Sequence, residues 1–347
     1  MLAIGGKVTV PLPFVCPACK GELASRETEY HCPGCRRGFP VLFGIADFRL
    51  RSDRYLTLES ERAKARRLYE FGLTSTFDEL VAFYYSITDD VPEELAVRYR
   101  AYIRAAPARG ARILSELAPV TSSDSLIDLG CGTGGLIVAA ASRFGATVGI
   151  DIALRWLVIC AKRLAEEGID ANLACADVEA LPFAAESFTH AVAADLMENV
   201  YDPDNTVAEI AKHLKPGGTL WLSATNKFTL GPHPLVRLWG IGFLPKPLRA
   251  AVVKTFRGRD SLRNVNLVSP MALARLCRSK GLDVVGLEPS RVQTASLDAY
   301  PRFDRILIYL YRVALRARVL RRFLVLAGPA FEMLCRKAGQ ARNVADN

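Results

Sequence analysis

A glycine-rich turn between two acidic residues is the part of the sequence best suited to chemistry. Residues 130–135 read GCGTGG, with Asp128 two positions before them and Asp151 at the end of the next apolar segment. Glycine lets a ligand lie directly against backbone N–H groups where such a turn leads into a helix. A carboxylate at the tip of the following strand is suited to the two hydroxyls of a ribose. The stretch 125–151 therefore predicts a site for an adenosyl cofactor.

Two strands and a helix must hold this turn in place. Residues 125–127 predict a strand that leads into Asp128, an apolar helix follows the turn, and a second strand ends in the acid at 151. Gly130, Gly132 and Gly135 also match the G-x-G-x-x-G pattern of nicotinamide-binding proteins. The turn alone therefore leaves the kind of adenosyl cofactor open.

Further motifs lie downstream of this stretch. A third strand is predicted at 172–176 and is followed directly by Asp177, and a fourth strand is predicted at 188–195. Residues 214–218 read LKPGG and lead into a fifth strand at 219–224. These additional motifs argue against a nicotinamide cofactor.

With these motifs in this order, residues 125–225 resemble the class I S-adenosylmethionine-dependent methyltransferases, especially the subgroup typified by quinone-biosynthesis C-methyltransferases. The resemblance implies an α/β fold with a Rossmann-like sheet of seven strands and helices on both faces. The sixth strand is expected at 282–288 and the last at 331–337, and in this family the last strand runs antiparallel to the sixth.

The resemblance also implies a set of cofactor-binding residues. The glycines approach the methionine part of S-adenosylmethionine, and Asp128 accepts a hydrogen bond from its ammonium group. Asp151 takes both ribose hydroxyls, and Asp177 accepts from the adenine amino group with Val178 beside the ring. A loop or helix-capping role is the alternative for Asp177. The full predicted set is Asp128, Gly130, Gly132, Gly134, Asp151, Ile152, Asp177, Val178 and Asp195.

Candidate catalytic residues come from a motif in which this chain departs from the family. Relatives often show L-x-E-H-V-x-D-P, whereas residues 196–203 read LMENVYDP. Asn199 thus replaces a histidine that is a candidate general base in some relatives, although an amide can still hold a substrate hydroxyl. His233 lies in a rigid Gly-Pro-His-Pro loop, and loop structure alone could explain it. The candidates are Glu198, Asn199 and His233.

A second chemical feature is a pair of C-x2-C motifs near the N-terminus. Cys16 and Cys19 form the first, and Cys32 and Cys35 form the second. Four thiolates complete a closed, tetrahedral and structural zinc site, and the metal would supply the folding energy of so short a segment. The alternative is four cysteines without a metal. The segment resembles the zinc-ribbon modules that are fused to or partner methyltransferases, in which the second motif leads into a strand pair like that at 39–48.

Composition indicates a folded intracellular chain. Half of the 347 residues are hydrophobic, which allows a sizeable core. The other five of the nine cysteines are scattered through apolar segments, so a reducing compartment is expected rather than a disulfide framework. No signal peptide is visible, and no run approaches the roughly 18 apolar residues of a membrane span. The expected location is cytoplasmic, with peripheral contact at the inner face of the membrane as a further possibility.

The positive charge is concentrated in the C-terminal third. The net charge is +9, but residues 1–234 contain 24 Lys+Arg and 29 Asp+Glu, whereas residues 235–347 contain 21 and 7. Such a region predicts an anionic partner, which could be nucleic acid, phospholipid or a phosphorylated small molecule.

The sequence predicts three domains. Residues 1–50 form the zinc ribbon, 51–120 a helical cap or linker, and 121–347 the methyltransferase domain with basic insertions at 226–268 and 300–328. Tyrosines of the helical part either pack between helices or cap a ligand; they are Tyr84, Tyr85, Tyr99 and Tyr102.

The two insertions bear on the methyl acceptor. Both should border the ligand-binding edge of the sheet, since ligands lie beyond the carboxyl ends of parallel strands. Their arginines alternate with bulky aliphatic residues, which favours a small-molecule or lipid-linked acceptor of anionic or amphiphilic character, or an anionic membrane. The alternative within the insertions is a helical subdomain whose arginines lie over its own core. On one ideal helix Arg302, Arg305, Arg312 and Arg316 share a face, but Arg318, Arg321 and Arg322 do not.

Two other functions stay open from the sequence. A similar layout of zinc ribbon and methyltransferase occurs in ribosomal RNA guanine methyltransferases, so the chain could methylate rRNA or tRNA bases. The basic third lacks the exposed Gly, Ser and aromatic platforms that favour RNA. A non-catalytic, methyltransferase-like partner subunit is the third hypothesis, and the intact glycine turn argues against it.

Overall fold

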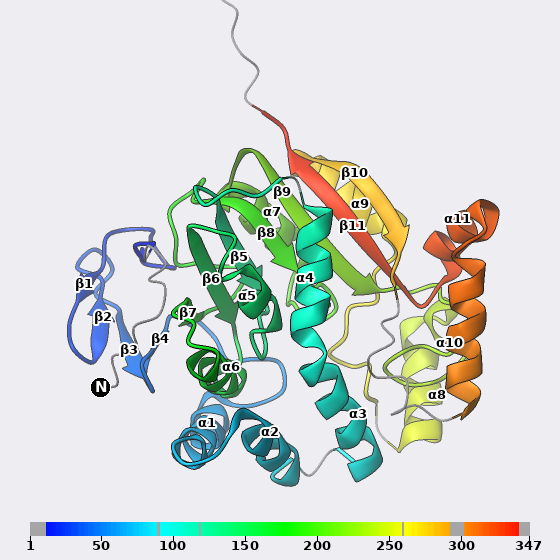
Figure 1. Cartoon of the computed structure of the whole chain (residues 1–347), viewed down its shortest axis with the longest axis horizontal. Coiled ribbons are helices and arrows are strands. Elements are labelled where there is room, and N and C mark those ends of the chain that lie inside the picture. The colour runs from blue at the N-terminus through cyan, green and yellow to red at the C-terminus, as the bar shows by residue number, and fades with distance from the viewer. Residues whose placement is uncertain (1–11, 89–90, 118, 259, 292–301, 340–347) are drawn as a thin grey trace, which may run out of the picture.

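The computed structural model describes residues 12–88, 91–117, 119–258, 260–291 and 302–339. Each domain or insertion range predicted from the sequence includes some positions outside these residues, such as 300–301 in the second insertion. Figure 1 shows the sheet at the centre, the N-terminal strands at one end and α10 and α11 at the other.

The strands of the described residues form one sheet in the order β1-β2-β3-β4-β7-β6-β5-β8-β9-β11-β10. Their bounds are β1 Ala24–Ser25, β2 Glu29–His31, β3 Gly38–Leu42, β4 Ile45–Asp47, β5 Ser125–Leu129, β6 Ala146–Asp151, β7 Asn172–Cys175, β8 Phe188–Ala193, β9 Leu214–Thr225, β10 Leu282–Pro289 and β11 Ala330–Lys337.

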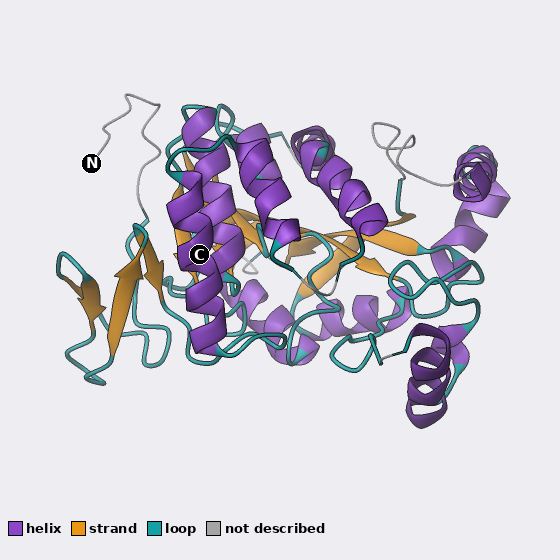
Figure 2. Ribbon diagram, turned by 90° about the horizontal axis from the view of Figure 1, so that it is seen from below, coloured by secondary structure: helices purple, strands orange, loops and turns teal. Residues whose placement is uncertain are grey.

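The helices surround this sheet. Their bounds are α1 Leu58–Gly72, α2 Phe77–Ser86, α3 Glu93–Arg104, α4 Ala106–Glu116, α5 Gly135–Ala140, α6 Leu154–Glu166, α7 Pro203–His213, α8 Lys246–Arg257, α9 Pro270–Ser279, α10 Arg302–Ala314 and α11 Arg318–Ala327, with a short 3-10 helix η1 at Ile241–Phe243. Figure 2 shows helices on both faces of the sheet.

The centre of the sheet is parallel. β5 pairs with β6 and β8, and β6 and β8 pair outward with β7 and β9, all in parallel. β5 and β6 are buried along their whole length, as is usual for parallel strands covered by helices on both sides. β11 lies between β9 and β10 and is antiparallel to both. The predicted α/β fold, with an antiparallel last strand, is therefore confirmed.

The predicted count of seven strands is not confirmed. Seven strands run from β7 to β10 in the sheet order, but β4 pairs in parallel with β7 and brings the N-terminal strands into the same sheet. Aromatic packing holds this junction, because the ring of Phe14 contacts those of Phe48 and Phe183 at centroid distances of 4.8 and 5.5 Å. No sequence pattern indicates this pairing, since the motifs of the sheet begin only at residue 125.

Local signals explain where several helices begin. Thr76 caps α2 through a capping box, in which its side chain accepts from Glu79 N and the Glu79 carboxylate accepts from Thr76 N. Thr57, Asp202 and Ser269 cap α1, α7 and α9 in the same general way, each accepting a backbone N–H.

The two basic insertions leave the sheet at one place. Thr225 at the end of β9 pairs with Ala330 at the start of β11, so both insertions adjoin the carboxyl end of β9. The first contains η1, α8 and a small core of its own, formed by Val236, Ile241, Val253 and Leu262. The second forms two helices, α10 and α11, rather than one, so the arginine faces must be assigned to each helix separately. None of the helices in the described ranges combines the length and the apolar composition of a bilayer-spanning segment.

Candidate functional site

The glycine turn is fixed from beneath by β6 and α6. The backbone N–H groups of Gly130 and Cys131 both donate to the carbonyl oxygen of Ile150, at 2.7 and 2.9 Å. Gly134 has a φ of +75°, and a Cβ at this position would lie 2.5 Å from the Sγ of Cys160. Both its conformation and its surroundings therefore require glycine.

Asp151 joins the tip of β6 to this turn. Its Oδ2 accepts from Gly132 N at 2.9 Å, and its Oδ1 accepts from Ala153 N at 2.8 Å. Burial raises its pKa, although the two backbone N–H groups oppose the rise. Each carboxylate oxygen has a second lone pair, so both oxygens can still accept a hydrogen bond from a ligand.

Asp128 is buried next to Asp151 at the end of β5. Burial, with a smaller effect from the negative charge of Asp151, raises the pKa of Asp128 to about 8. A neighbouring cation favours the ionised form of a carboxyl group. The site therefore contains a buried acid whose charge depends on whether a cationic ligand is bound.

A pocket of about 510 Å³ lies at the carboxyl ends of β5, β6 and β8. Part of the predicted cofactor set lines it, namely Gly130, Asp151, Ile152, Asp177, Val178 and Asp195. Asp128, Gly132 and Gly134 are not among the lining residues. The structure thus brings six of the nine predicted residues to one cavity, and the other three are not part of its lining.

Asp177 is paired with a residue from the N-terminal part of the chain. Its Oδ2 accepts from Nε of Arg51, while Nη2 of Arg51 contacts the Glu179 carboxylate at 2.6 Å. Its Oδ1 accepts from Glu179 N at 2.9 Å, so the loop-capping role considered for Asp177 is present. The guanidinium group of Arg51 also lies 4.0 Å from the centre of the Tyr201 ring.

Asp195 follows β8 and is held from two sides. The hydroxyl of Ser223 in β9 donates to its Oδ1 at 2.8 Å, and the hydroxyl of Tyr102 in α3 donates to its Oδ2 at 3.1 Å. Its φ of +52° is uncommon for a residue other than glycine. Asn199, one turn further on, accepts at its Oδ1 from the hydroxyl of Tyr55 at 2.8 Å.

A methyltransferase-domain family model matches residues 127–222. A ubiquinone biosynthesis O-methyltransferase from Paracidovorax citrulli is 33% identical over 172 residues, which are 49% of this chain and 67% of that relative. The chain belongs to the class I S-adenosylmethionine-dependent methyltransferases. Its cofactor, as the sequence predicts, is S-adenosylmethionine.

Other known proteins are also similar to parts of this chain. A ubiquinone biosynthesis O-methyltransferase from Nitrosospira multiformis is 31% identical over 163 residues, covering 46% of this methyltransferase and 62% of the relative. The solved structure of geranyl diphosphate C-methyltransferase from Streptomyces coelicolor A3(2) is similar with a TM-score of 0.48 at 18% identity, over 70% of this chain and 83% of that one. The matches with the curated relatives cover between 44% and 67% of their own length.

Part of the lining of the methyltransferase pocket comes from a segment near the N-terminus that the sequence did not indicate. We call residues 49–56 the strap; it links the N-terminal strands to α1 and contributes Asp53, Arg54 and Tyr55 to the pocket lining. Arg49 donates to the Asp47 carboxylate at 2.7 Å and to the Ile152 carbonyl at 3.2 Å. Arg54 donates to Val200 O at 2.6 Å, so the strap is tied to both walls.

A buried ion-pair cluster lies under the strap. Arg155 of α6 donates from Nη1 to Asp53 at 2.8 Å and forms an ion pair with Glu61 of α1, whose Oε1 accepts from Arg155 N. All three residues are buried. The one available signal was Arg155 itself, a lone charge in the apolar run ALRWLVIC, because such a charge needs a buried partner.

The catalytic candidates occupy different places. Asn199 lines the pocket, whereas Glu198 and His233 do not. Glu198 is buried, its Oε1 accepts from Thr225 N and Oγ1, and burial together with the charge of Asp195 raises its pKa to about 7. His233 is fully buried in the first insertion, where burial lowers its pKa to about 4.

The tyrosines of the helical part divide between both expected roles. Tyr99 lines the pocket and Tyr102 reaches Asp195, so these two face the site. Tyr84 is buried against Trp156, with ring centres 4.3 Å apart, and the ring of Tyr85 packs edge-on against the ring of Tyr84.

The four N-terminal cysteines lie together at the opposite end of the sheet from α11. Their Sγ atoms are all within 4.8 Å of one another. The Sγ–Sγ distances are 3.5 Å between Cys16 and Cys35 and 3.4 Å between Cys19 and Cys32. Four thiols converging on one point are the donor set of a closed zinc site.

Proposed function

We propose that this methyltransferase moves the methyl group of S-adenosylmethionine to a hydroxyl of a small or lipid-linked acceptor. The observation that carries the proposal is the pocket, in which predicted cofactor residues and the strap line one space of about 510 Å³. This volume is typical of sites for small ligands. The names of the O-methyltransferase relatives support a hydroxyl as the methylated group.

The chain's own residues would position the two reactants. When bound, S-adenosylmethionine supplies a methyl group on a sulfonium centre with a good leaving group. Asp128, Asp151 and Asp177 would hold its ammonium, ribose and adenine parts. The strap and Tyr99 would exclude water, and alignment in a dry pocket accounts for much of the acceleration in such a displacement.

Asp195 is the proposed acceptor of the substrate's hydroxyl proton. The carboxylates among the lining residues are Asp53, Asp151, Asp177 and Asp195. Asp53 is engaged by Arg155, and Asp177 by Arg51. Asp195 is held by two hydroxyls instead, and a hydroxyl can rotate away when a substrate arrives. Asn199 lies beside it and would orient the acceptor.

We also propose that Cys16, Cys19, Cys32 and Cys35 hold a structural zinc ion. The convergence of their Sγ atoms supports the donor set, and a site of four thiolates leaves no position for a substrate. The metal would act on folding alone. Lys20, next to the first motif, pairs with Glu209 of α7 at 2.7 Å and donates to Leu181 O, so a folded cysteine module would be attached to the catalytic domain.

Labelled methyl transfer tests the proposed function. The full chain is incubated with methyl-labelled S-adenosylmethionine and a cell extract, which is then separated into lipid, small-molecule, RNA and protein fractions. We expect label in the lipid or small-molecule fraction, and none with Asp151→Asn. Label in RNA would replace the proposed acceptor with a nucleic acid. Absence of S-adenosylmethionine binding in calorimetry would instead support a non-catalytic partner subunit.

A further inference from the structure

α10 and α11 each expose an apolar stripe to solvent. On α10 the stripe consists of Phe303, Ile306, Tyr309, Leu310 and Val313, and on α11 of Val319, Phe323 and Leu326. The exposed fraction reaches 80% for Val319 and 66% for Tyr309. Their spacing of three and four residues places each set on one side of its helix.

These two helices have no core of their own. The described residues of α10 and α11 contribute no member to any buried apolar cluster, and Asp304 is the only one of them that is buried. The first insertion, by contrast, has its own small core. The alternative of a helical subdomain packed around its own core therefore fits the first insertion but does not fit α10 and α11.

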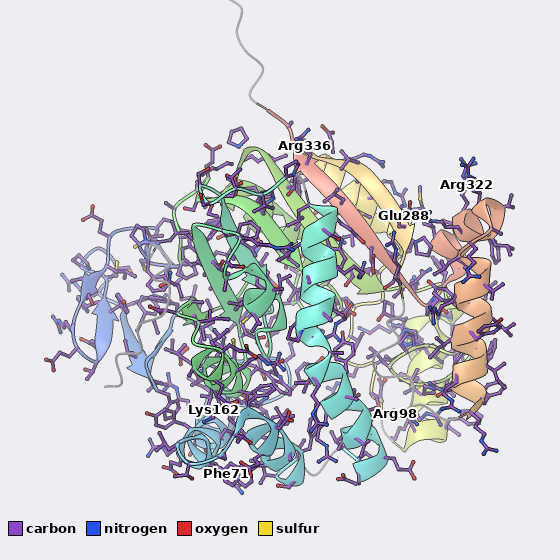
Figure 3. The ribbon with its side chains drawn as sticks, in the orientation of Figure 1. Phe71, Arg98, Lys162, Glu288, Arg322 and Arg336 are labelled. Atoms are coloured by element: carbon purple, nitrogen blue, oxygen red, sulfur yellow. The ribbon has the colours of Figure 1, made fainter. Side chains whose placement is uncertain are left out.

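Positive charge flanks both stripes. On α10, Arg305 and Arg312 lie beside the stripe, and on α11 Arg318 and Arg322 do so. Figure 3 shows Arg322 projecting outward from α11. The acid of α10, Asp304, is buried against Arg237, and α11 has none. Among the residues that the structure describes, no carboxylate pairs with Arg312, Arg318 or Arg322.

The helices are nevertheless attached firmly to the domain. Asp304 joins α10 to the first insertion through Arg237, and the Tyr311 hydroxyl donates to Ser290 O at 2.7 Å. Asn226, at the end of β9, donates to Leu326 O at 2.8 Å. An apolar groove of about 480 Å³ continues the α11 stripe onto Phe228, Leu230 and Phe243 of the first insertion.

We propose that α10 and α11 form a docking face for the surface of an anionic lipid bilayer. Apolar side chains flanked by arginines on solvent-exposed helices suit the boundary between headgroups and acyl chains, where both parts find partners. Charge complementarity selects this occupant, because the face is cationic and anionic headgroups attract such a surface. A lipid-linked acceptor would then meet the enzyme at this face. Only this last statement rests on the proposed function.

Co-flotation of the full chain with vesicles tests the docking face. The probes are vesicles of phosphatidylcholine alone and of phosphatidylcholine with about one third phosphatidylglycerol. We expect binding to the anionic vesicles that weakens with added salt, and little binding to the neutral ones. Val319→Glu/Phe323→Glu and Arg318→Glu/Arg322→Glu should each reduce this binding roughly tenfold or more.

Matched substitutions elsewhere provide the controls. Leu73 and the pair Arg66 and Arg67, at α1, are exposed and lie far from α11, so Leu73→Glu and Arg66→Glu/Arg67→Glu should leave vesicle binding unchanged. All variants should bind S-adenosylmethionine with the affinity of the parent chain, which separates the docking face from the proposed function.

Three outcomes would overturn the docking face. Equal flotation of the parent chain and both α11 variants would show that this surface does not contact lipid. Retention of RNA, rather than vesicles, that is lost in Arg318→Glu/Arg322→Glu would assign the face to nucleic acid. A dimer in analytical ultracentrifugation that Val319→Glu/Phe323→Glu dissociates, without any vesicle binding, would assign it to a second copy of the chain.

Discussion

The proposed contact of Asp128 with the cofactor would make cofactor binding depend on pH. Its raised pKa of about 8 means that the carboxyl group is mostly neutral at pH 7 in the empty site. Because a cationic ligand needs the ionised form, binding must release a proton below this pKa.

The affinity for S-adenosylmethionine should therefore rise with pH up to about 8, by on the order of tenfold per pH unit below the pKa. Calorimetry in buffers of different ionisation enthalpy measures both the affinity and the released proton. Asp128→Asn should bind more weakly and without this pH dependence; a parent affinity that stays flat between pH 6 and 8 would contradict the assignment.

Asp128 should also make the stability of the cofactor-free protein depend on pH. This stability should fall, rather than rise, with increasing pH. Its folded-state pKa lies above the unfolded value of about 3.9, so the folded state binds more protons across that interval. The contribution of Asp128 is thus fully present below pH 4 and is lost as the pH rises through 8. Denaturant unfolding without cofactor, compared between the parent chain and Asp128→Asn, isolates this contribution.

Asp195 should affect turnover and leave the cofactor in place. If it takes the acceptor's proton, Asp195→Asn lowers kcat by about 100-fold or more, the usual size of a general-base contribution. The affinity for S-adenosylmethionine should change little. A variant that loses affinity instead would place Asp195 with the cofactor residues, the role that the family resemblance implies.

At the scale of elements, the strap forms part of the pocket lining. Arg51 joins it to Asp177 and Glu179 through ion pairs. Arg51→Met keeps a long unbranched side chain but removes the charged hydrogen bonds and the contact of the guanidinium group with the Tyr201 ring. We expect S-adenosylmethionine affinity to fall about fivefold, the size of one modest hydrogen bond, with little change in thermal stability. The exposed Arg26, which pairs only locally with Glu29 among the described residues, offers the matched control Arg26→Met.

The cysteine module is a second element with a direct test. Cys32→Ser should release the proposed zinc, because one thiolate fewer opens the tetrahedral site. Elemental analysis of purified protein should fall from about one zinc per chain to a small fraction. Retention of a full equivalent by the variant would exclude the four-cysteine site, whereas Cys277→Ser, outside the cluster, should keep its metal.

Elements with strong local signals were predicted well. β5, the glycine turn and β6 lie where the residues at 125–151 indicate, and β7 begins at Asn172 as expected. These signals are local, since buried strands and glycine turns are specified by neighbouring residues. The break between α10 and α11 was not predictable in this way, because residues 302–327 contain neither glycine nor proline to mark it.

At the scale of the whole molecule, the missing information is long-range. The strap residues Asp53 and Tyr55 meet Arg155 and Asn199 across separations of 102 and 144 positions. A single sequence shows no pattern that pairs such distant residues. Even Arg155, a lone charge in an apolar run, does not indicate which distant residue it meets. The acids of the cofactor set can be proposed from the sequence only because they belong to a spaced motif.

The pairing of β4 with β7 covers one edge of the parallel sheet. The two strands share only the pairs Ala46↔Ala174 and Asp47↔Cys175, with one more bond from Phe48 N to Cys175 O. If the N-terminal module unfolds, β7 becomes an open strand edge that another chain can extend.

Removal of the proposed zinc ion by a chelator should therefore cause the protein to aggregate as well as weaken cofactor binding. Light scattering after removal of zinc should increase with protein concentration, and restored metal should prevent the increase only if it is added early. On this prediction the N-terminal module protects an aggregation-prone strand edge, and the supply of zinc would determine the solubility of the whole chain.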